Sequence, residues 1–249
     1  MGNRFMGLIL AIVVGLPILP VALAQNAGRP DLSGVWQPNK RGEEWIGSVH
    51  PKLDEIPMTA DAKWIFDYNK DPRNPLAGRS ELSPSVTCAP VSSTWLLQRT
   101  GRPGSQWMET IQNPKRLLMI FENDHWVRQI WTDGREHPED LDYSWMGHSI
   151  GKWDGDTLVV DTVGIHDKAW LTSAGHPLSD ALRVVERFRR PNQDTLEIDV
   201  MYHDSKLYTK PWGWKAAFKL VPNGELAEKV CNESRWLYGI DESTAYPAY

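Results

Sequence analysis

Residues 147–163 read GHSIGKWDGDTLVVDTV, two short runs with strand character joined by a tight turn. The first run covers 147–153, and the second, 157–163, is rich in β-branched side chains, which favour strands. Asp154-Gly155 lies between them, and this dipeptide is typical of a two-residue hairpin turn. The stretch therefore predicts an antiparallel β-hairpin.

Similar runs continue on both sides of this hairpin. Asp133-Gly134 and the segment PNQD at 191–194 supply further turns. No long helical segment separates the runs, which disfavours a parallel α/β sheet. Many sequential strands tend to close into a barrel, because closure removes exposed edges. We expect a mainly β fold, an antiparallel up-and-down barrel of about eight strands, from the runs 116–122, 126–132, 147–153, 157–163, 182–190, 195–202, 214–221 and 228–231.

The N-terminal part of the mature chain, 25–106, has a different character. It is rich in loop-forming residues, and only the run LSGVW at 32–36 predicts a strand. Residues 59–68 predict a helix, with Thr59 or Asp61 as its N-cap. We expect one domain over 25–249, in which this loop- and helix-rich part covers one end of a strand meander formed by 107–249.

Residues 1–24 resemble a targeting segment. An early Arg4, an apolar run and the final Ala22-Leu23-Ala24 predict a cleavable secretory signal. An uncleaved transmembrane anchor is the alternative, and the short run with its two prolines disfavours it. We therefore expect a periplasmic or secreted protein without stable membrane insertion.

Export affects the interpretation of the two cysteines, Cys88 and Cys231. In an oxidising compartment an even pair predicts one disulfide, which here would close a long loop. Two unpaired buried thiols are the alternative. A zinc site is less favoured, because neither cysteine has a C-x-x-C partner.

Composition restricts the partners. The formal net charge of −5 argues against a nucleic acid held by phosphate neutralisation and against a polybasic membrane patch. The chain has 13 Trp, and each buries a large area while keeping one N–H donor. This content predicts either a thick aromatic core or an aromatic-lined cavity for a small hydrophobic molecule. The oligomeric state is left open.

Two carboxylates interrupt apolar rows of predicted strands. Asp161 and Glu186 each lie on a strand face whose other residues are apolar. A carboxylate on a core-facing row needs a partner or a raised pKa, so we expect both in a polar pocket inside the barrel. The structural alternatives are that Asp161 accepts hydrogen bonds from turn amides and that Glu186 forms an interior ion pair with Arg128 or Arg187.

The remaining candidates for chemistry surround these carboxylates. His148 is predicted as a general acid or base with Asp161 as its orienting carboxylate, although a packed histidine without a catalytic role is the alternative. Arg135 or Arg187 would stabilise a developing oxyanion. No two histidines have metal-ligand spacing, so a metal site would need ligands from separate strands, and the P-loop and G-x-G-x-x-G motifs are absent. We therefore expect neither a metal nor an organic cofactor. The predicted catalytic residues are His148, Asp161, Arg135 and Glu186, and the predicted substrate-binding residues are Trp145, His137, His176, Trp131 and Arg187.

Several segments together resemble a poorly characterised family of exported bacterial proteins that carries a GHSxGxWxGDTLVVDT-type motif. That family is similar in outline to lipocalin-like β-barrels that hold small hydrophobic molecules. The resemblance implies a fold and a location, with little mechanism. It rests on DGREHP at 133–138, SWMGHSIGKWDGDTLVVDTVG at 144–164, GHPLSDALRVVERFRR at 175–190, DLSGVW at 31–36 and YTKPW at 208–212.

Two functions from different classes fit these patterns. The first is a cofactor-independent enzyme of the lyase, dehydratase or isomerase type, which moves protons on a small, hydrophobic, cyclic substrate inside an aromatic-lined barrel. The second is a lipocalin-like carrier without catalysis, in which the polar interior residues only orient the ligand.

Overall fold

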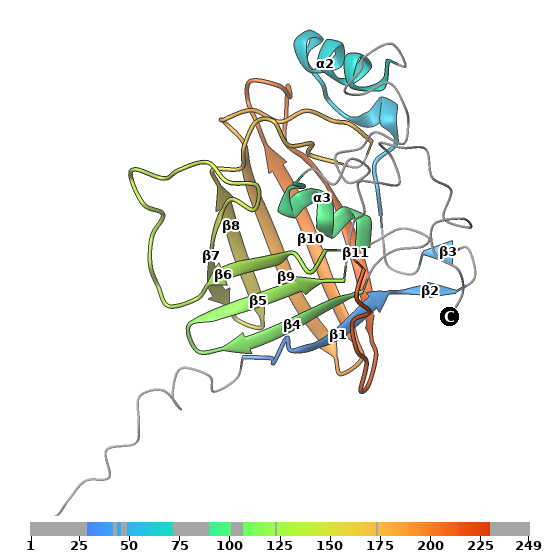
Figure 1. Cartoon of the computed structure of the whole chain (residues 1–249), viewed down its shortest axis with the longest axis vertical. Coiled ribbons are helices and arrows are strands. Elements are labelled where there is room, and N and C mark those ends of the chain that lie inside the picture. Colours follow the sequence, from blue (N-terminus) through green and yellow to red (C-terminus); the bar gives the residue numbers. More distant parts are fainter. Residues whose placement is uncertain are drawn as a thin grey trace, which may run out of the picture.

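A closed β-barrel forms the body of the computed structural model, which confirms the mainly β fold (Figure 1). The structure describes residues 29–41, 44–45, 49–71, 90–100, 107–122, 124–172 and 174–229. The predicted signal segment 1–24 and both cysteines of the predicted disulfide, Cys88 and Cys231, lie outside these ranges.

Within the described ranges nine strands close the barrel, in the order β1-β11-β10-β9-β8-β7-β6-β5-β4, and β4 pairs back to β1. A separate two-stranded sheet joins β2 (Lys40–Arg41) to β3 (Glu44–Trp45). The barrel strands are β1 (Gly34–Pro38), β4 (Met108–Asn113), β5 (Arg116–Phe121), β6 (Val127–Trp131), β7 (His148–Asp154), β8 (Thr157–Val163), β9 (Arg183–Asn192), β10 (Thr195–His203) and β11 (Trp212–Leu220).

Two features differ from the predicted up-and-down meander. β6 and β7 pair in parallel, with Ile130 opposite Ser149, because the connection 132–147 carries the chain back before β7 begins. The barrel is closed by β1 and β4, whereas 228–229, the described part of the predicted strand 228–231, belong to no strand of the barrel.

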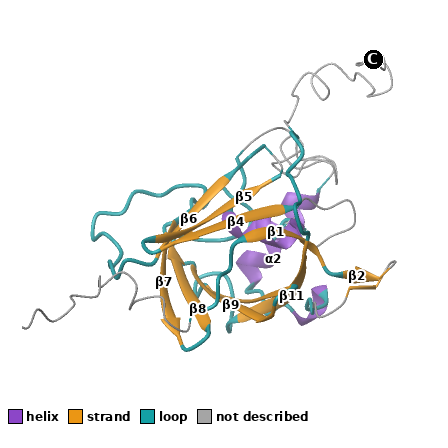
Figure 2. Cartoon of the chain, turned by 90° about the horizontal axis from the view of Figure 1, so that it is seen from below, coloured by secondary structure: helices purple, strands orange, loops and turns teal. Residues whose placement is uncertain are grey.

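Within the described ranges, two α-helices and a short 3₁₀ helix accompany the barrel. In α2 (Ala60–Lys70) the predicted cap is confirmed, since the Thr59 hydroxyl accepts a hydrogen bond from the Ala62 amide at 3.2 Å. α3 (Ser93–Thr100), which the sequence patterns did not predict, is capped by Ser92 and buries Trp95 completely. A short 3₁₀ helix, η1 (Leu53–Glu55), precedes α2. Figure 1 shows α2 beyond one end of the barrel, and Figure 2, a view from below, shows the strands arranged as a ring.

Alternation along the strands separates the barrel wall into an inner and an outer face. β9 shows this most clearly, because Val184, Glu186 and Phe188 are fully buried while Arg187 and Arg189 are exposed. Large side chains occupy the interior, and most of them are apolar. They include Trp36, Tyr202, Phe121, Phe188 and Phe218, each less than 2% exposed.

Candidate functional site

Asp161 lies on the outer face of β8. This strand buries Leu158, Val160 and Thr162, so Asp161 and its neighbours of odd number point away from the core. The prediction that Asp161 faces the interior is therefore wrong. Both rows of β8 contain two aliphatic or β-branched residues and one polar residue, and the interior row places Thr162 next to a buried arginine. The sequence alone could not decide between the two rows.

The connection 132–147 partly covers this outer face. Ile150 is paired with Asp161 across β7 and β8 and also points outward, yet it is only 6% exposed. Ser144 fixes the connection by accepting from the His166 amide and donating its own amide to Gly164, both at 2.9 Å. A surface that would otherwise face solvent is thereby half-buried, which suits a site that must limit access of water.

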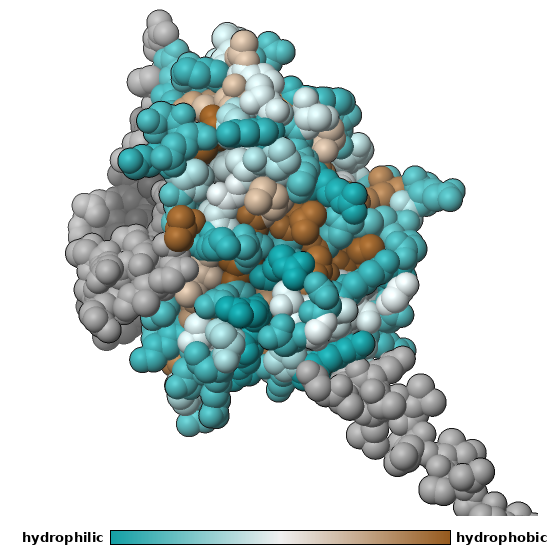
Figure 3. Space-filling model, turned by 180° about the vertical axis from the view of Figure 1, so that it is seen from behind, coloured by the Kyte–Doolittle hydropathy of each residue, from teal (hydrophilic) through white to brown (hydrophobic). Residues whose placement is uncertain are grey.

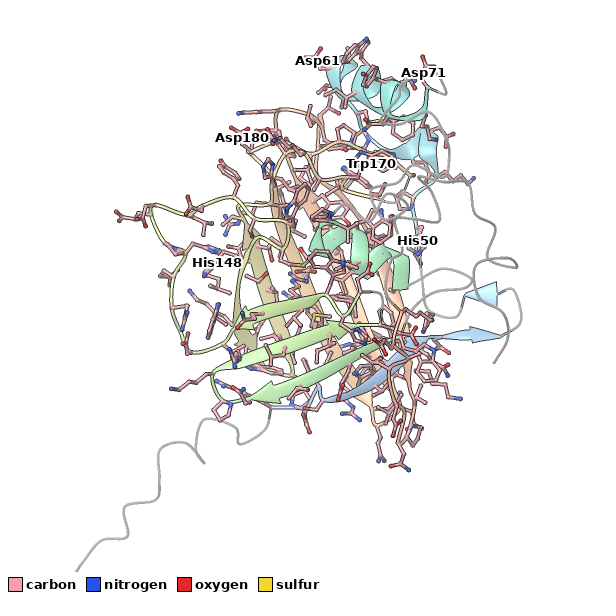
Figure 4. All side chains as sticks on the ribbon, in the orientation of Figure 1. His50, Asp61, Asp71, His148, Trp170 and Asp180 are labelled. Carbon is pink, nitrogen blue, oxygen red and sulfur yellow. The ribbon has the colours of Figure 1, made fainter. Side chains whose placement is uncertain are left out.

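His137, His148, Asp161 and Arg183 form one hydrogen-bonded cluster under this connection. The Nδ1 atoms of His137 and His148 are 2.8 Å apart, and His137 Nε2 is 3.3 Å from Asp161 Oδ2. Arg183 holds the same carboxylate through two bonds of 2.7 Å, from Nε to Oδ1 and from Nη2 to Oδ2. Figure 4 shows His148 on the flank of the barrel, well away from Trp170 near α3.

Hydrogen bonding within the cluster determines its protonation. Burial acts to raise the pKa of Asp161, but the hydrogen bonds of Arg183 and His137, the charge of Arg183 and the charge of a protonated His137 outweigh it and lower the pKa. Asp161 is therefore a carboxylate near neutral pH, and His137 must donate through Nε2. While His137 is neutral, its Nδ1 atom is an acceptor and His148 donates through its own Nδ1, so the lone pair of His148 lies on Nε2. A protonated His137 donates through Nδ1 as well, and the proton of a neutral His148 then lies on Nε2.

His148 is suited to act as a base. Burial and the charges of His137 and Arg135 lower its pKa below the ordinary 6.5, which keeps its imidazole neutral at pH 7. Among the described residues, none forms a hydrogen bond with Nε2 of His148. With His137 neutral, the hydrogen-bonded series Asp161–His137–His148 thus ends in an unprotonated nitrogen of the half-buried His148.

Arg135 and Trp131 lie together beside the hydrogen-bonded residues Asp161, His137 and His148. The Arg135 guanidinium stacks over the Trp131 ring at 3.7 Å and pairs with Asp133, with Nη2 and Oδ2 2.6 Å apart. Arg135 affects His148 through its charge alone. Its predicted contact with a developing oxyanion remains untested.

Glu186 lies inside the barrel, as the sequence predicts, but it belongs to a hydrogen-bond network separate from that of Asp161 and His148. Arg128 Nη1 donates to Glu186 Oε1 at 2.7 Å, and Nη2 donates to the second oxygen. The same guanidinium donates to Ser149 and Thr162, so the fully buried ion pair is saturated with hydrogen bonds. The expected convergence of His148, Asp161 and Glu186 around one interior cavity is wrong, because the barrel wall separates Glu186 from the other two.

The other predicted substrate-binding residues are dispersed. Trp145 stacks on His166, with ring centroids 5.2 Å apart. Arg187 points outward and pairs with Asp154 at 3.1 Å. His176 is buried and lies against Phe66 of α2, where Nδ1 is 2.6 Å from the Thr172 hydroxyl. Of the predicted set, the structure brings only His148, Asp161, His137, Arg135 and Trp131 to one region.

Arg183 is the functional candidate that sequence reasoning missed. Arg183 belongs to the row of β9 that also carries the exposed Arg187 and Arg189, and it is itself exposed, but it also holds Asp161 across the β8–β9 pairing. Only the register of these two strands could have revealed this contact, since no local spacing pattern links residues 161 and 183.

No group of three or more His, Cys, Asp or Glu side chains within the described ranges is arranged to hold a metal ion. Over the same residues, no helix has the length and apolar character required to cross a bilayer. In comparisons with known proteins, no family model matches the chain and no curated protein is a significant match.

Proposed function

We propose that this protein is a cofactor-independent acid–base enzyme of the lyase or isomerase type and that His148 is its general base. The observation that carries the proposal is the hydrogen-bonded chain from Asp161 through His137 to His148. With His137 neutral, this arrangement leaves Nε2 of His148 unprotonated. The acting residues lie on the outer wall of the barrel, so the substrate is proposed to bind there and not in the barrel interior.

The chain can accept a proton and move its charge. When Nε2 of His148 takes a proton from a substrate C–H or O–H, its Nδ1 proton can pass to Nδ1 of His137 over 2.8 Å. The positive charge then resides on His137, next to the Asp161 carboxylate. A charge stabilised in this way makes His148 a more effective base. Return of the proton to a second carbon of the substrate completes an isomerisation, whereas its delivery to a departing hydroxide, released as water, completes an elimination.

The surroundings favour an apolar substrate. Val163 is paired with His148 across β7 and β8, and Val185 is paired with Asp161 across β8 and β9. Both valines point outward and are only partly buried. They offer apolar surface beside the base, which agrees with the hydrophobic, cyclic substrate expected from the sequence.

Hydrogen–deuterium exchange tests the proposal without knowledge of the natural reaction. The full chain would be incubated in D₂O with a panel of cyclic ketones, and deuterium at carbon would be measured by mass spectrometry. We expect exchange above the buffer rate, reduced about 100-fold or more in His148→Gln. His166→Gln serves as the matched control and should keep wild-type exchange, because His166 is hydrogen-bonded to Asp167 and not to Asp161, His137 or His148. Equal exchange in wild type and His148→Gln would overturn the proposal.

A carrier of a small hydrophobic molecule is the second candidate, and one observation favours it. Trp212 is 7% exposed and lies among Tyr202, Tyr208 and His176, with ring centroids 4.9 to 5.6 Å from its own. Its buried Nε1 has no hydrogen-bond partner among the described residues, so a ligand carbonyl could accept from it. Quenching of Trp fluorescence by a ligand that is recovered unchanged would favour the carrier.

The proposal includes where the protein acts. We expect the chain to be exported through the signal segment 1–24 and to form a disulfide between Cys88 and Cys231. Mass spectrometry of the exported protein before and after reduction tests both, since cleavage before Gln25 and a two-proton mass gain on reduction are the expected results.

A further inference from the structure

A groove lies on the outer face of the barrel. It has a volume of about 310 Å³ and lies over β8 to β11. The cluster of His137, His148, Asp161 and Arg183 lies toward one end of β8 and β9, and the groove lies toward the other end. Arg187 lies two residues along β9 from Val185, which is paired with Asp161, so groove and cluster share one face about 7 Å apart along the strand. The lining residues are Thr157, Arg187, Arg189, Glu197, Ile198, Asp199, Lys215 and Ala216.

Charges of opposite sign alternate in this groove. Arg189 donates to Glu197 through Nε at 3.1 Å and through Nη2 at 2.7 Å. Lys215 pairs with Asp199 at 2.7 Å, and Arg187 pairs with Asp154 just outside the groove. The pairs are half-exposed, so they hold one another only weakly and keep other donor and acceptor sites open toward the groove.

This arrangement discriminates between classes of ligand. An anion would approach the arginines but also the Glu197 and Asp199 carboxylates, and a cation would meet Arg187, Arg189 and Lys215. A neutral hydroxyl suffers neither repulsion, and it is the small group that can accept from a guanidinium while it donates to a neighbouring carboxylate. Several hydroxyls on one ring could use several of these sites at once.

We infer that the groove binds a hydroxyl-rich ring, a sugar unit of a saccharide or glycoside. Thr157 also lines the groove, and because its hydroxyl donates to Asp156 at 2.9 Å, it can serve a ligand only as an acceptor. Toward the cluster, Val185 and the 38% exposed Met201 are paired across β9 and β10 and provide an apolar shelf beside the polar groove. Figure 3, which shows the molecule from behind, has apolar patches set among hydrophilic side chains on that side. The inference concerns binding alone, goes beyond the proposed function and does not require His148 to be a base.

Amide NMR spectra of the ¹⁵N-labelled full chain test the inference. Glucose, maltose and N-acetylglucosamine would be titrated separately to about 100 mM, which detects millimolar dissociation constants. Inorganic phosphate would be titrated in parallel to represent an anion. We expect at least one sugar to shift the amides of 197–199 and 215–216, and phosphate to leave them unchanged.

Variants locate the binding and separate the ligand classes. Arg189→Ala should weaken sugar binding at least about fivefold, because it removes donors from the groove. Glu197→Gln keeps the shape of the side chain and one acceptor, and it should weaken sugar binding less. Lys219→Ala removes a cation from the same strand as Lys215 but outside the groove, so it should bind as wild type does. His148→Gln should also bind unchanged, which separates this inference from the acid–base proposal.

Three results would overturn the inference. The first is the absence of any sugar-dependent shift in the groove. The second is binding of phosphate alone, strengthened in Glu197→Gln, which would define an anion site. The third is a sugar-dependent shift that Arg189→Ala and Glu197→Gln both leave intact, since the sugar would then bind elsewhere.

Discussion

His137 and His148 face each other through their Nδ1 atoms at 2.8 Å, with ring planes 70° apart. One residue comes from the connection after β6 and the other begins β7, so the contact also docks the connection on the barrel wall. Because two lone pairs cannot share this distance, one proton must lie between the rings. The Asp161 carboxylate on the far side of His137 determines which ring carries it.

The first prediction concerns this proton. Near pH 7.5 the ¹⁵N side-chain spectrum should show His137 protonated at Nε2 and His148 protonated at Nδ1. Asp161→Asn should change the spectrum to a mixture of tautomers for both rings, since an amide can either donate or accept. His166, which faces Asp167, should keep its spectrum in this variant. A His148 ring protonated at Nε2 in the wild type would contradict the proposed base.

A second prediction follows from the lowered pKa of His148. Burial and the charges of His137 and Arg135 disfavour its protonated form in the folded state, whereas the unfolded chain takes up the proton near 6.5. The unfolded state therefore binds more protons as the pH falls below 6.5, and the free energy of unfolding decreases until the lower folded pKa is passed.

Urea unfolding at about pH 7.5 and about pH 5 measures this dependence, and His148→Gln should reduce it. The pKa of Asp161 is also lowered, so its contribution to the free energy of unfolding changes only at pH values below about 3.8. It therefore does not affect the comparison between about pH 7.5 and about pH 5. An unchanged difference between the two pH values in His148→Gln would show that other groups cause the acid sensitivity.

The third prediction isolates the charge of Arg135. Arg135→Gln removes a positive charge near His148, so the pKa of His148 should rise toward its ordinary value. Arg116→Gln is a matched control, because Arg116 also lies over the Trp131 ring, at 5.5 Å, but does not act on His148. Titration of the His148 ring signals in the two variants provides the measurement, and equal shifts in both would contradict the assigned cause.

More of the fold than of the candidate site could be predicted from the sequence. Strand runs and turn dipeptides depend on local propensity, and they located the hairpin of 147–163 and the strand 182–190 correctly. The inward direction of Glu186 was also correct, because its neighbours on that face are large and apolar while the alternate row is basic. For Asp161 the two rows were equally apolar, and the choice depended on Arg128, which lies in a different strand.

Closure and strand direction depended on contacts that no local pattern contains. The parallel pairing of β6 and β7 results from the path of the 132–147 connection, and such a path is set by tertiary packing. The same path brings His137 to His148, so the error in topology and the incomplete prediction of the site have one cause. Arg183 was missed for the related reason that its partner lies across a strand pair.

The fourth prediction concerns the buried pair Arg128–Glu186. Removal of one partner leaves a charge in the core without compensation, so Glu186→Leu should lower the free energy of unfolding by about 3–5 kcal/mol. The double variant Arg128→Met/Glu186→Leu should recover much of this loss, because it removes both charges. Urea denaturation gives the values. Additive losses in the double variant would contradict the coupling.

The last prediction depends on the close approach of two backbones at Gly213. A Cβ atom added there would lie 1.9 Å from the Val200 carbonyl oxygen on β10, which forces the paired strands apart. Gly213→Ala should therefore lower the free energy of unfolding by about 3 kcal/mol. Gly155→Ala is the control, since Gly155 has φ +62° but open space around its Cβ position, and it should cost only about 1–2 kcal/mol. Gly213 pairs with Met201, which belongs to the apolar shelf. A smaller decrease of the free energy of unfolding in Gly213→Ala than in Gly155→Ala would mean that β10 and β11 separate easily at this point.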